Sequence, residues 1–90
     1  MSLEELREVF LKIEAERFTI INGYIMGVLK KSEIDRFEKA LFGFREKLYE
    51  FSWNEDNMME IAKMKSKVQH FNTEILEDEE VLKVAYSNEN

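Results

Sequence analysis

The sequence predicts an all-α fold, a three- to four-helix bundle, from three observations. Apolar residues recur at helical spacing, capping-box strings divide the chain, and proline is absent from all 90 residues. We expect helices at about 3–31, 33–51 and 54–77, with a short fourth helix at 79–86. A chain of this length forms one domain, 1–90, in which 87–90 is expected to be a frayed tail.

The first expected helix, 3–31, carries two apolar stripes. One consists of Leu3, Leu6, Phe10, Ile13, Ile20 and Tyr24, and the other of Leu11, Phe18 and Ile25, spaced by seven residues. Two stripes predict two neighbours, which are either the other helices or a second copy of the chain.

Residues 18–29 also fit a second interpretation. β-Branched and aromatic residues lie on both sides of Asn22-Gly23, a dipeptide that favours a β-hairpin turn. The helical spacing of apolar residues continues across this dipeptide, which favours a helix that breaks there. The alternative fold is therefore α+β, with a β-hairpin at 18–29.

The later helices are predicted by single apolar seams behind capping strings. The three strings are Ser2-Leu3-Glu4-Glu5, Ser32-Glu33-Ile34-Asp35 and Ser52-Trp53-Asn54-Glu55. The seam of 33–51 contains Ile34, Phe37, Leu41, Phe44, Leu48 and Phe51, and that of 54–77 contains Ile61, Met64, Val68, Phe71 and Ile75. Both seams have alternating spacings of three and four, which place their members on one helix face.

Acidic residues are concentrated near the end of the chain. Residues 77–90 hold five acids against one base, and so contribute −4 of the net charge of −6. Glu77, Asp78, Glu79 and Glu80 are expected to form the acidic start of a helix or a docking surface for a basic partner. An acidic chain disfavours direct nucleic-acid binding, and its short apolar runs predict no membrane span. The expected location is cytoplasmic.

Most catalytic and metal-binding signatures are missing from the sequence. The absence of cysteine excludes disulfides, thiolate metal sites and cysteine nucleophiles. His70 is the one histidine, and with Glu74 four residues later it offers at most half of a divalent metal site. We therefore expect no enzyme activity and no cofactor, with a metal-dependent enzyme using His70 as the weakest alternative.

Arg17 interrupts the first apolar stripe. An arginine in such a seam is expected to lie with its stem along the core and to pair with an acid of its own helix, such as Glu14, or of a neighbouring helix. The alternative is a buried polar position that fixes the register or the oligomeric state.

The predicted function is a non-catalytic protein–protein interaction module. It is expected to be a small acidic adaptor or inhibitor that forms homo-oligomers, most simply a dimer, because so short a chain cannot bury all its apolar stripes. The expected binding residues are Phe42, Tyr49, Trp53, Met58 and Met59, together with the acidic residues 77–80. The alternative is an acidic regulator, of the immunity-protein type, that occupies a nucleic-acid-binding or active site of another protein.

Overall fold

The computed structural model describes residues 1–88 and confirms the all-α class. The elements are α1 (Leu3–Ile25), α2 (Lys31–Glu50), α3 (Met58–Phe71), the π-helical turn η1 (Asn72–Leu76) and α4 (Glu79–Ser87). No strand occurs among these 88 residues. Each predicted helix is present, although most of the boundaries differ from those expected.

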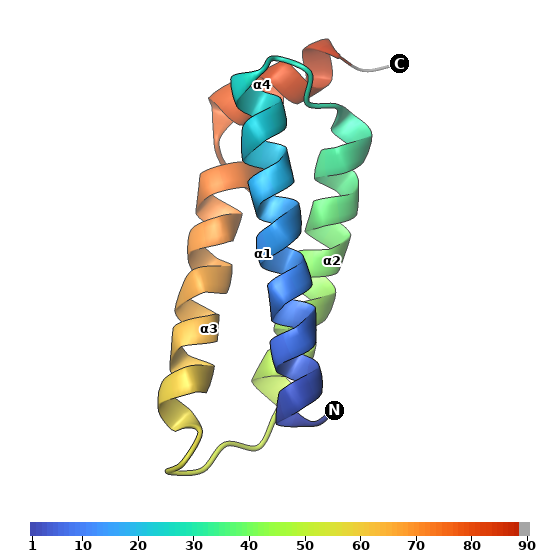
Figure 1. Ribbon diagram of the computed structural model, residues 1–90. Helices are drawn as coiled ribbons and strands as arrows, with labels where there is room; N and C mark the ends of the chain where they lie inside the picture. Colours follow the sequence, from blue (N-terminus) through green and yellow to red (C-terminus); the bar gives the residue numbers. More distant parts are fainter. Residues whose placement is uncertain (89–90) are drawn as a thin grey trace.

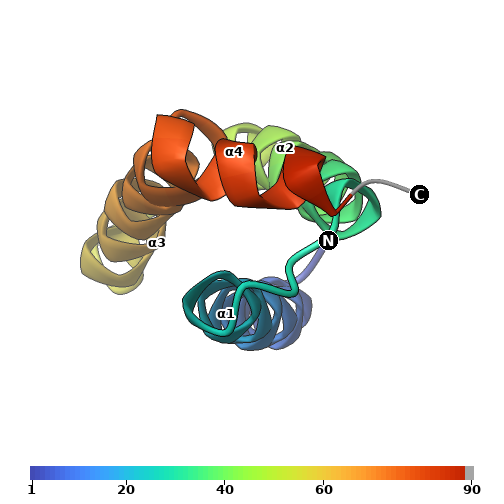
Figure 2. The same ribbon diagram turned by 90° about the horizontal axis from the view of Figure 1, so that it is seen from above.

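The molecule is a rod of 46 × 18 × 17 Å whose long axis follows α1, α2 and α3 (Figure 1). α2 packs against both α1 and α3, and α4 crosses one end of the rod (Figure 2). In the same view α1 stands apart from α3, and the α1 face that points away from the bundle is not covered by α4. The bundle therefore has α2 at its centre and α1 at its edge.

The core is formed by the seams that the spacing predicts. The buried side chains of α2 are Ile34, Phe37, Leu41, Phe44 and Leu48, and those of α3 and η1 are Ile61, Met64, Val68, Phe71 and Ile75. From α1 the core takes Leu6, Phe10, Ile13 and Ile20, with Leu3 and Tyr24 partly buried beside it. Burial of each large apolar side chain stabilises the fold by roughly 1.5–3 kcal/mol, and these contributions hold the three long helices together.

The hairpin alternative is wrong, because Asn22-Gly23 lies inside α1. The helix ends at Ile25 rather than at residue 31, and the chain reverses at Gly27, which has φ +72°. The Val28 N–H donates to the Gly23 carbonyl at 2.9 Å and the Gly27 N–H donates to the Tyr24 carbonyl at 3.0 Å. These two bonds form a Schellman motif, in which glycine occupies the left-handed position. The break that the sequence places at Asn22-Gly23 therefore occurs four residues later.

Of the three predicted capping boxes, only the first lies at its predicted position. The Glu5 N–H donates to Ser2 Oγ and the Ser2 N–H donates to Glu5 Oε1, as the box requires. α2 begins two residues earlier than its string predicts, with the Lys30 N–H donating to Glu33 Oε1 at 3.1 Å.

α3, in contrast, begins later than the sequence predicts, at Met58 rather than at residue 54. The Asn54 N–H donates to Asn57 Oδ1 at 2.8 Å, and the Asn57 N–H donates to Asn54 Oδ1 at 3.2 Å. This reciprocal pair replaces the predicted box at Ser52, and regular helix begins only at Met58. An Asn side-chain carbonyl accepts backbone N–H bonds as well as a Ser hydroxyl does, so either residue type can cap the start of this helix.

The helix expected at 54–77 changes to a wider turn before it ends. After Phe71 the chain forms η1, which closes with the Glu77 N–H donating to the Asn72 carbonyl at 3.1 Å. Such π-turns add one residue to a helical turn. The seam is maintained across it, since Ile75 is fully buried.

Ser87 and Asn88, the first two residues of the predicted tail, are attached to the rest of the chain. Ser87 belongs to α4, and Asn88 Nδ2 donates to the carbonyls of Gly27 at 2.9 Å and Leu29 at 3.1 Å. These bonds attach the end of α4 to the loop between α1 and α2. The last two positions of the predicted tail lie outside the described residues.

We expect opposite effects from alanine at two glycines of this region. Gly27→Ala should destabilise the fold by about 1–2 kcal/mol, because an L-residue is strained at positive φ. Gly23→Ala should stabilise it by up to about 1 kcal/mol, because alanine favours the helix interior and its Cβ would meet Leu29 Cα at an ordinary 3.5 Å. Urea unfolding followed by circular dichroism measures both values. Equal losses in the two variants would contradict the assigned turn.

Candidate protein-interaction surface

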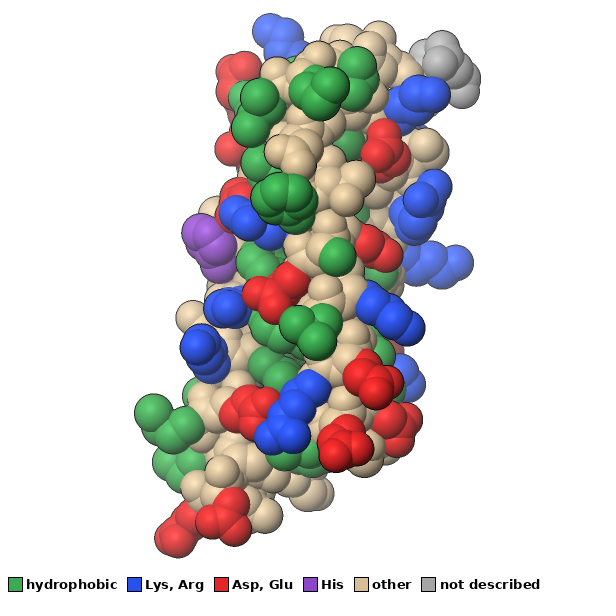
Figure 3. Space-filling model, in the orientation of Figure 1, with side chains coloured by type: hydrophobic (Ala, Val, Ile, Leu, Met, Phe, Trp, Pro, Cys, Tyr) green, Lys and Arg blue, Asp and Glu red, His purple; other side chains and the backbone are tan. Residues whose placement is uncertain are grey.

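One face of α1 remains exposed along the length of the bundle. Leu11, Phe18 and Ile25 are 64%, 63% and 72% exposed, although they recur with the seven-residue period of a packed helix. In Figure 3, hydrophobic side chains are spaced along the front of α1. The second stripe of the sequence therefore has no neighbour within the described chain, while the first stripe supplies the core.

Small side chains alternate with the large ones on this face. Ala15 and Asn22 are also exposed and lie between the three large residues, so that spacings of four and three alternate from Leu11 to Ile25. We call these five residues the α1 face. The three large residues occupy one position of the heptad repeat, and Ala15 and Asn22 occupy another.

Charge is distributed unevenly along the α1 face. The twelve residues from 18 to 29 include no acid and no base, and Met26 and Val28 add exposed apolar side chains to them. At the other end of the helix the same face continues into Glu4 and Glu8, both exposed. One half of the face is therefore apolar and the other half is acidic.

Ion pairs connect α1 to α3 and η1 beside the α1 face. Arg7 donates to both Glu60 carboxylate oxygens at 2.6 and 2.8 Å, and Lys67 Nζ lies 3.3 Å from Glu14 Oε2. Because Arg7 and Glu60 hydrogen-bond each other, the pKa of Glu60 is lowered and that of Arg7 is raised. These pairs close the gap between two helices that share few apolar contacts.

The stacked rings of Phe10 and Phe71 lie below the ion pairs. The Phe10 ring stacks with Phe71 at a centroid distance of 6.4 Å, and the Lys67 ammonium lies 5.6 Å from the Phe10 centroid. A shallow groove of about 340 Å³ opens here, lined by Arg7, Phe10, Leu11, Glu60, Lys63, Met64 and Lys67. Leu11 thus lies both on the α1 face and at the edge of this groove.

Arg17 makes its ion pair with a neighbouring element. Its Nη2 and Nε donate to Glu74 Oε1 at 2.6 and 3.1 Å, and its guanidinium carbon lies 5.6 Å from the Phe71 ring centroid. Glu14, the acid closer in sequence, pairs with Lys67 instead. Arg17 is about one-third exposed, so it joins α1 to η1 at the edge of the core rather than from within it.

His70 is mostly exposed and pairs with the same carboxylate. Its Nε2 lies 2.9 Å from Glu74 Oε2, the oxygen that Arg17 does not use. Among residues 1–88, no group of three or more histidine and carboxylate side chains is arranged to hold a metal ion.

The predicted aromatic residues of α2, Phe42 and Tyr49, are exposed. Phe42 and Tyr49 line a shallow hollow of about 370 Å³ together with Arg45 and Glu46. The ammonium of Lys65 on α3 lies 4.5 Å from the Tyr49 ring centroid, so one neighbour of this ring comes from α3. Tyr49 thus contributes to α2–α3 packing as well as to the surface.

The remaining apolar site residues lie at the turn into α3. Trp53 belongs to the connection after α2, and Met58 and Met59 begin α3. Met59 is the most exposed of the three at 76%. Met58 and Trp53 are also exposed, at 43% and 60%.

The acidic residues 77–80 have a structural role at one position. Asp78 Oδ1 accepts from the Glu80 N–H at 2.9 Å and from the Val81 N–H at 3.2 Å, and so caps α4. Glu79 and Glu80 occupy the first turn of that helix, where the helix dipole favours acids. Glu77, Glu79 and Glu80 are exposed.

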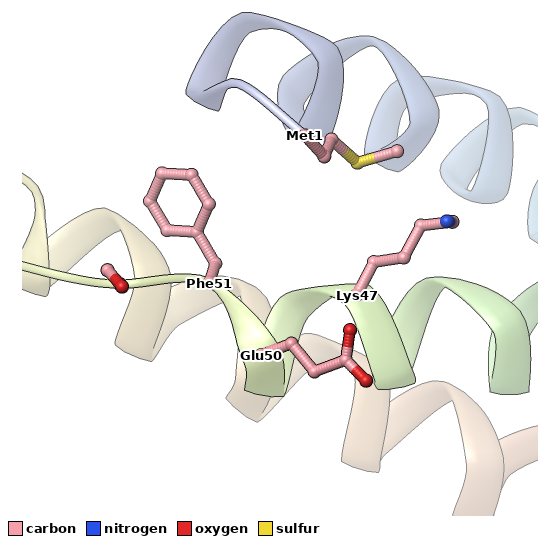
Figure 4. Close-up of a pocket in the computed structure, with 5 residues that line it drawn as sticks. Met1, Lys47, Glu50 and Phe51 are labelled. Carbon is pink, nitrogen blue, oxygen red and sulfur yellow. The ribbon is translucent and has the colours of Figure 1, made fainter.

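A further hollow of about 380 Å³ lies at the opposite end of the rod from α4. Met1, Lys47, Glu50, Phe51 and Ser52 line it, and Figure 4 shows the Phe51 ring directed toward the start of α1, where Met1 lies. None of the predicted site residues contributes to it.

The α1 face was visible in the sequence as the second stripe, but it was absent from the expected binding residues. Its signal was the seven-residue spacing of three large apolar residues on a helix that already had a complete seam. What the sequence left open was whether α2, α3 or another molecule would cover that stripe.

We expect the Arg7–Glu60 pair to make stability depend on pH in the acid range. The lowered pKa of Glu60 means that its contribution is present above its ordinary value of 4.5 and is lost as pH falls through the lowered value. Glu60→Gln should lower the Tm by roughly 2–5 °C at neutral pH, and the wild-type and variant curves should converge in acid.

Thermal unfolding between pH 7 and pH 3 measures this effect, with Glu38→Gln on exposed α2 surface as the control. A Glu60→Gln deficit that stays constant across the range would contradict the assignment.

Comparison with known proteins identifies no relative of this chain. No protein-family model matches it, and no match was found among curated proteins or among solved structures. The described part of the chain also has no helix with the length and apolar character needed to cross a membrane. Function has to be inferred from the surface of the chain itself.

Proposed function

We propose that this chain is a non-catalytic protein-interaction module that self-associates. The observation that supports this most directly is the α1 face, three large apolar side chains in regular helical register and each more than 60% exposed. Scattered exposed apolar residues are ordinary, whereas a continuous apolar line on a helix is typical of a packing surface. Its location in the cytoplasm is still a prediction.

The other surface hollows of the molecule are consistent with a protein-binding role. The hollows beside the α1–α3 ion pairs, on α2 and near Met1 are shallow, and each is lined by apolar and charged side chains. A bundle of this size buries one apolar stripe of α1 in its core and leaves the other available to a partner.

We expect the purified protein to form a dimer whose population rises with concentration. Sedimentation equilibrium from the low to the high micromolar range should show the mass rising from that of the 10.8 kDa monomer to twice that value. The dimer should persist in about 0.5 M NaCl, because an apolar interface is not screened and the repulsion between two chains of charge −6 is weakened by salt.

A monomer at every concentration would contradict self-association. Dissociation by salt would instead show that opposite charges, such as the exposed acids at 77–80, hold the copies together.

A further inference from the structure

We propose that the α1 face binds the α1 face of a second copy, with the two helices antiparallel. This inference rests on the proposed self-association and adds which surface pairs, in which direction and in which register. In this register Phe18 lies opposite Asn22 of the other copy, and Ile25 lies opposite Ala15 of the other copy.

The shape of the face favours this register. Large side chains occupy one line of the face and small ones the other, so that an antiparallel partner presents Asn22 to Phe18 and Ala15 to Ile25. In an antiparallel pair each layer joins one large and one small position, so Phe18 and Ile25 each fill the space beside a small side chain, while Leu11 lies level with the end of the other α1. A parallel pair would place Phe18 against Phe18 and Ala15 against Ala15, which crowds one layer and leaves a gap in another.

The charges on the face favour the same direction. An antiparallel pair places the acidic residues Glu4 and Glu8 of the two copies at opposite ends of the paired helices. A parallel pair would bring the acidic ends together.

A second copy fits the face better than a lipid surface does. The chain has a net charge of −6 and the α1 face continues into the exposed acids Glu4 and Glu8, so anionic headgroups would repel it. The face is also accessible, because α1 lies at the edge of the bundle and α4 crosses away from its outer side (Figure 2). A two-fold axis near residue 20 of α1 would relate the two faces in this register.

Cysteine cross-linking tests the register, and the chain offers a clean background because it has no cysteine. The double variant Ala15→Cys/Ile25→Cys should be converted mostly to a disulfide-linked dimer by copper phenanthroline, and a mixture of the two single variants should also cross-link. Each single variant alone should stay largely unlinked, because ten residues at 1.5 Å rise separate its two copies by about 15 Å. Disulfides require Cα atoms within about 7 Å.

The face itself is tested by a charge on its central residue. Phe18→Glu should raise the dimer dissociation constant by about 100-fold or more, because a carboxylate would be buried without a partner. Ala62→Glu, at an exposed residue of α3 outside the predicted binding residues, should leave the constant within about twofold. Circular dichroism checks that both variants keep the helical content of the wild type.

The possible failures can be distinguished. Efficient cross-linking of the single variants would overturn the antiparallel direction. A wild-type dimer that survives Phe18→Glu and gives no cross-link in the double variant would overturn the α1 face while leaving self-association intact. A wild-type monomer at every concentration would overturn both.

Discussion

Burial of the apolar seam of α2 is the constraint on which the rest of the packing depends. Phe37, Leu41, Phe44 and Leu48 are almost completely enclosed, and both α1 and α3 lie against this helix. Two helices that pack on the same central helix need not cover each other. α1 and α3 are accordingly joined largely by ion pairs above the Phe10–Phe71 stack, and the bundle is open on that side. Such exposed pairs orient neighbouring helices more than they stabilise them.

The position of α1 at the edge of the bundle explains why only one of its two stripes is buried. A helix at an edge has neighbours on one side, so a sequence with apolar residues on two sides retains an exposed face. The lack of charge from residue 18 to residue 29 has two consequences in this arrangement. It allows the Schellman turn and Leu29 to pack onto the end of α1, and it leaves the outer surface there apolar. The stability of the monomer and the proposed association thus depend on the same segment.

The candidate site could be predicted from the sequence only in part. The spacing of Leu11, Phe18 and Ile25 identified a second stripe, but spacing alone does not state what covers it. Phe42 and Tyr49 were correctly placed off the seam of α2, yet the contact of the Tyr49 ring with Lys65 of α3 depends on how the two helices pack. Arg17 was recognisable as a seam residue, whereas its partner was not, because Glu74 is 57 positions away in sequence. Contacts over such distances are set by how helices pack.

The sequence by itself determined the helical class, the buried seams and the residues that belong to each helix, because helical periodicity is a local property of the chain. Helix ends were less certain, since several residues compete to cap them: Asn54 and Asn57 prevailed over Ser52, and Gly27 over Asn22-Gly23. Only the tertiary structure decided which stripe of α1 is buried and which is exposed. That choice depends on the placement of α1 against one side of α2, and the two stripes contain side chains that are equally able to pack.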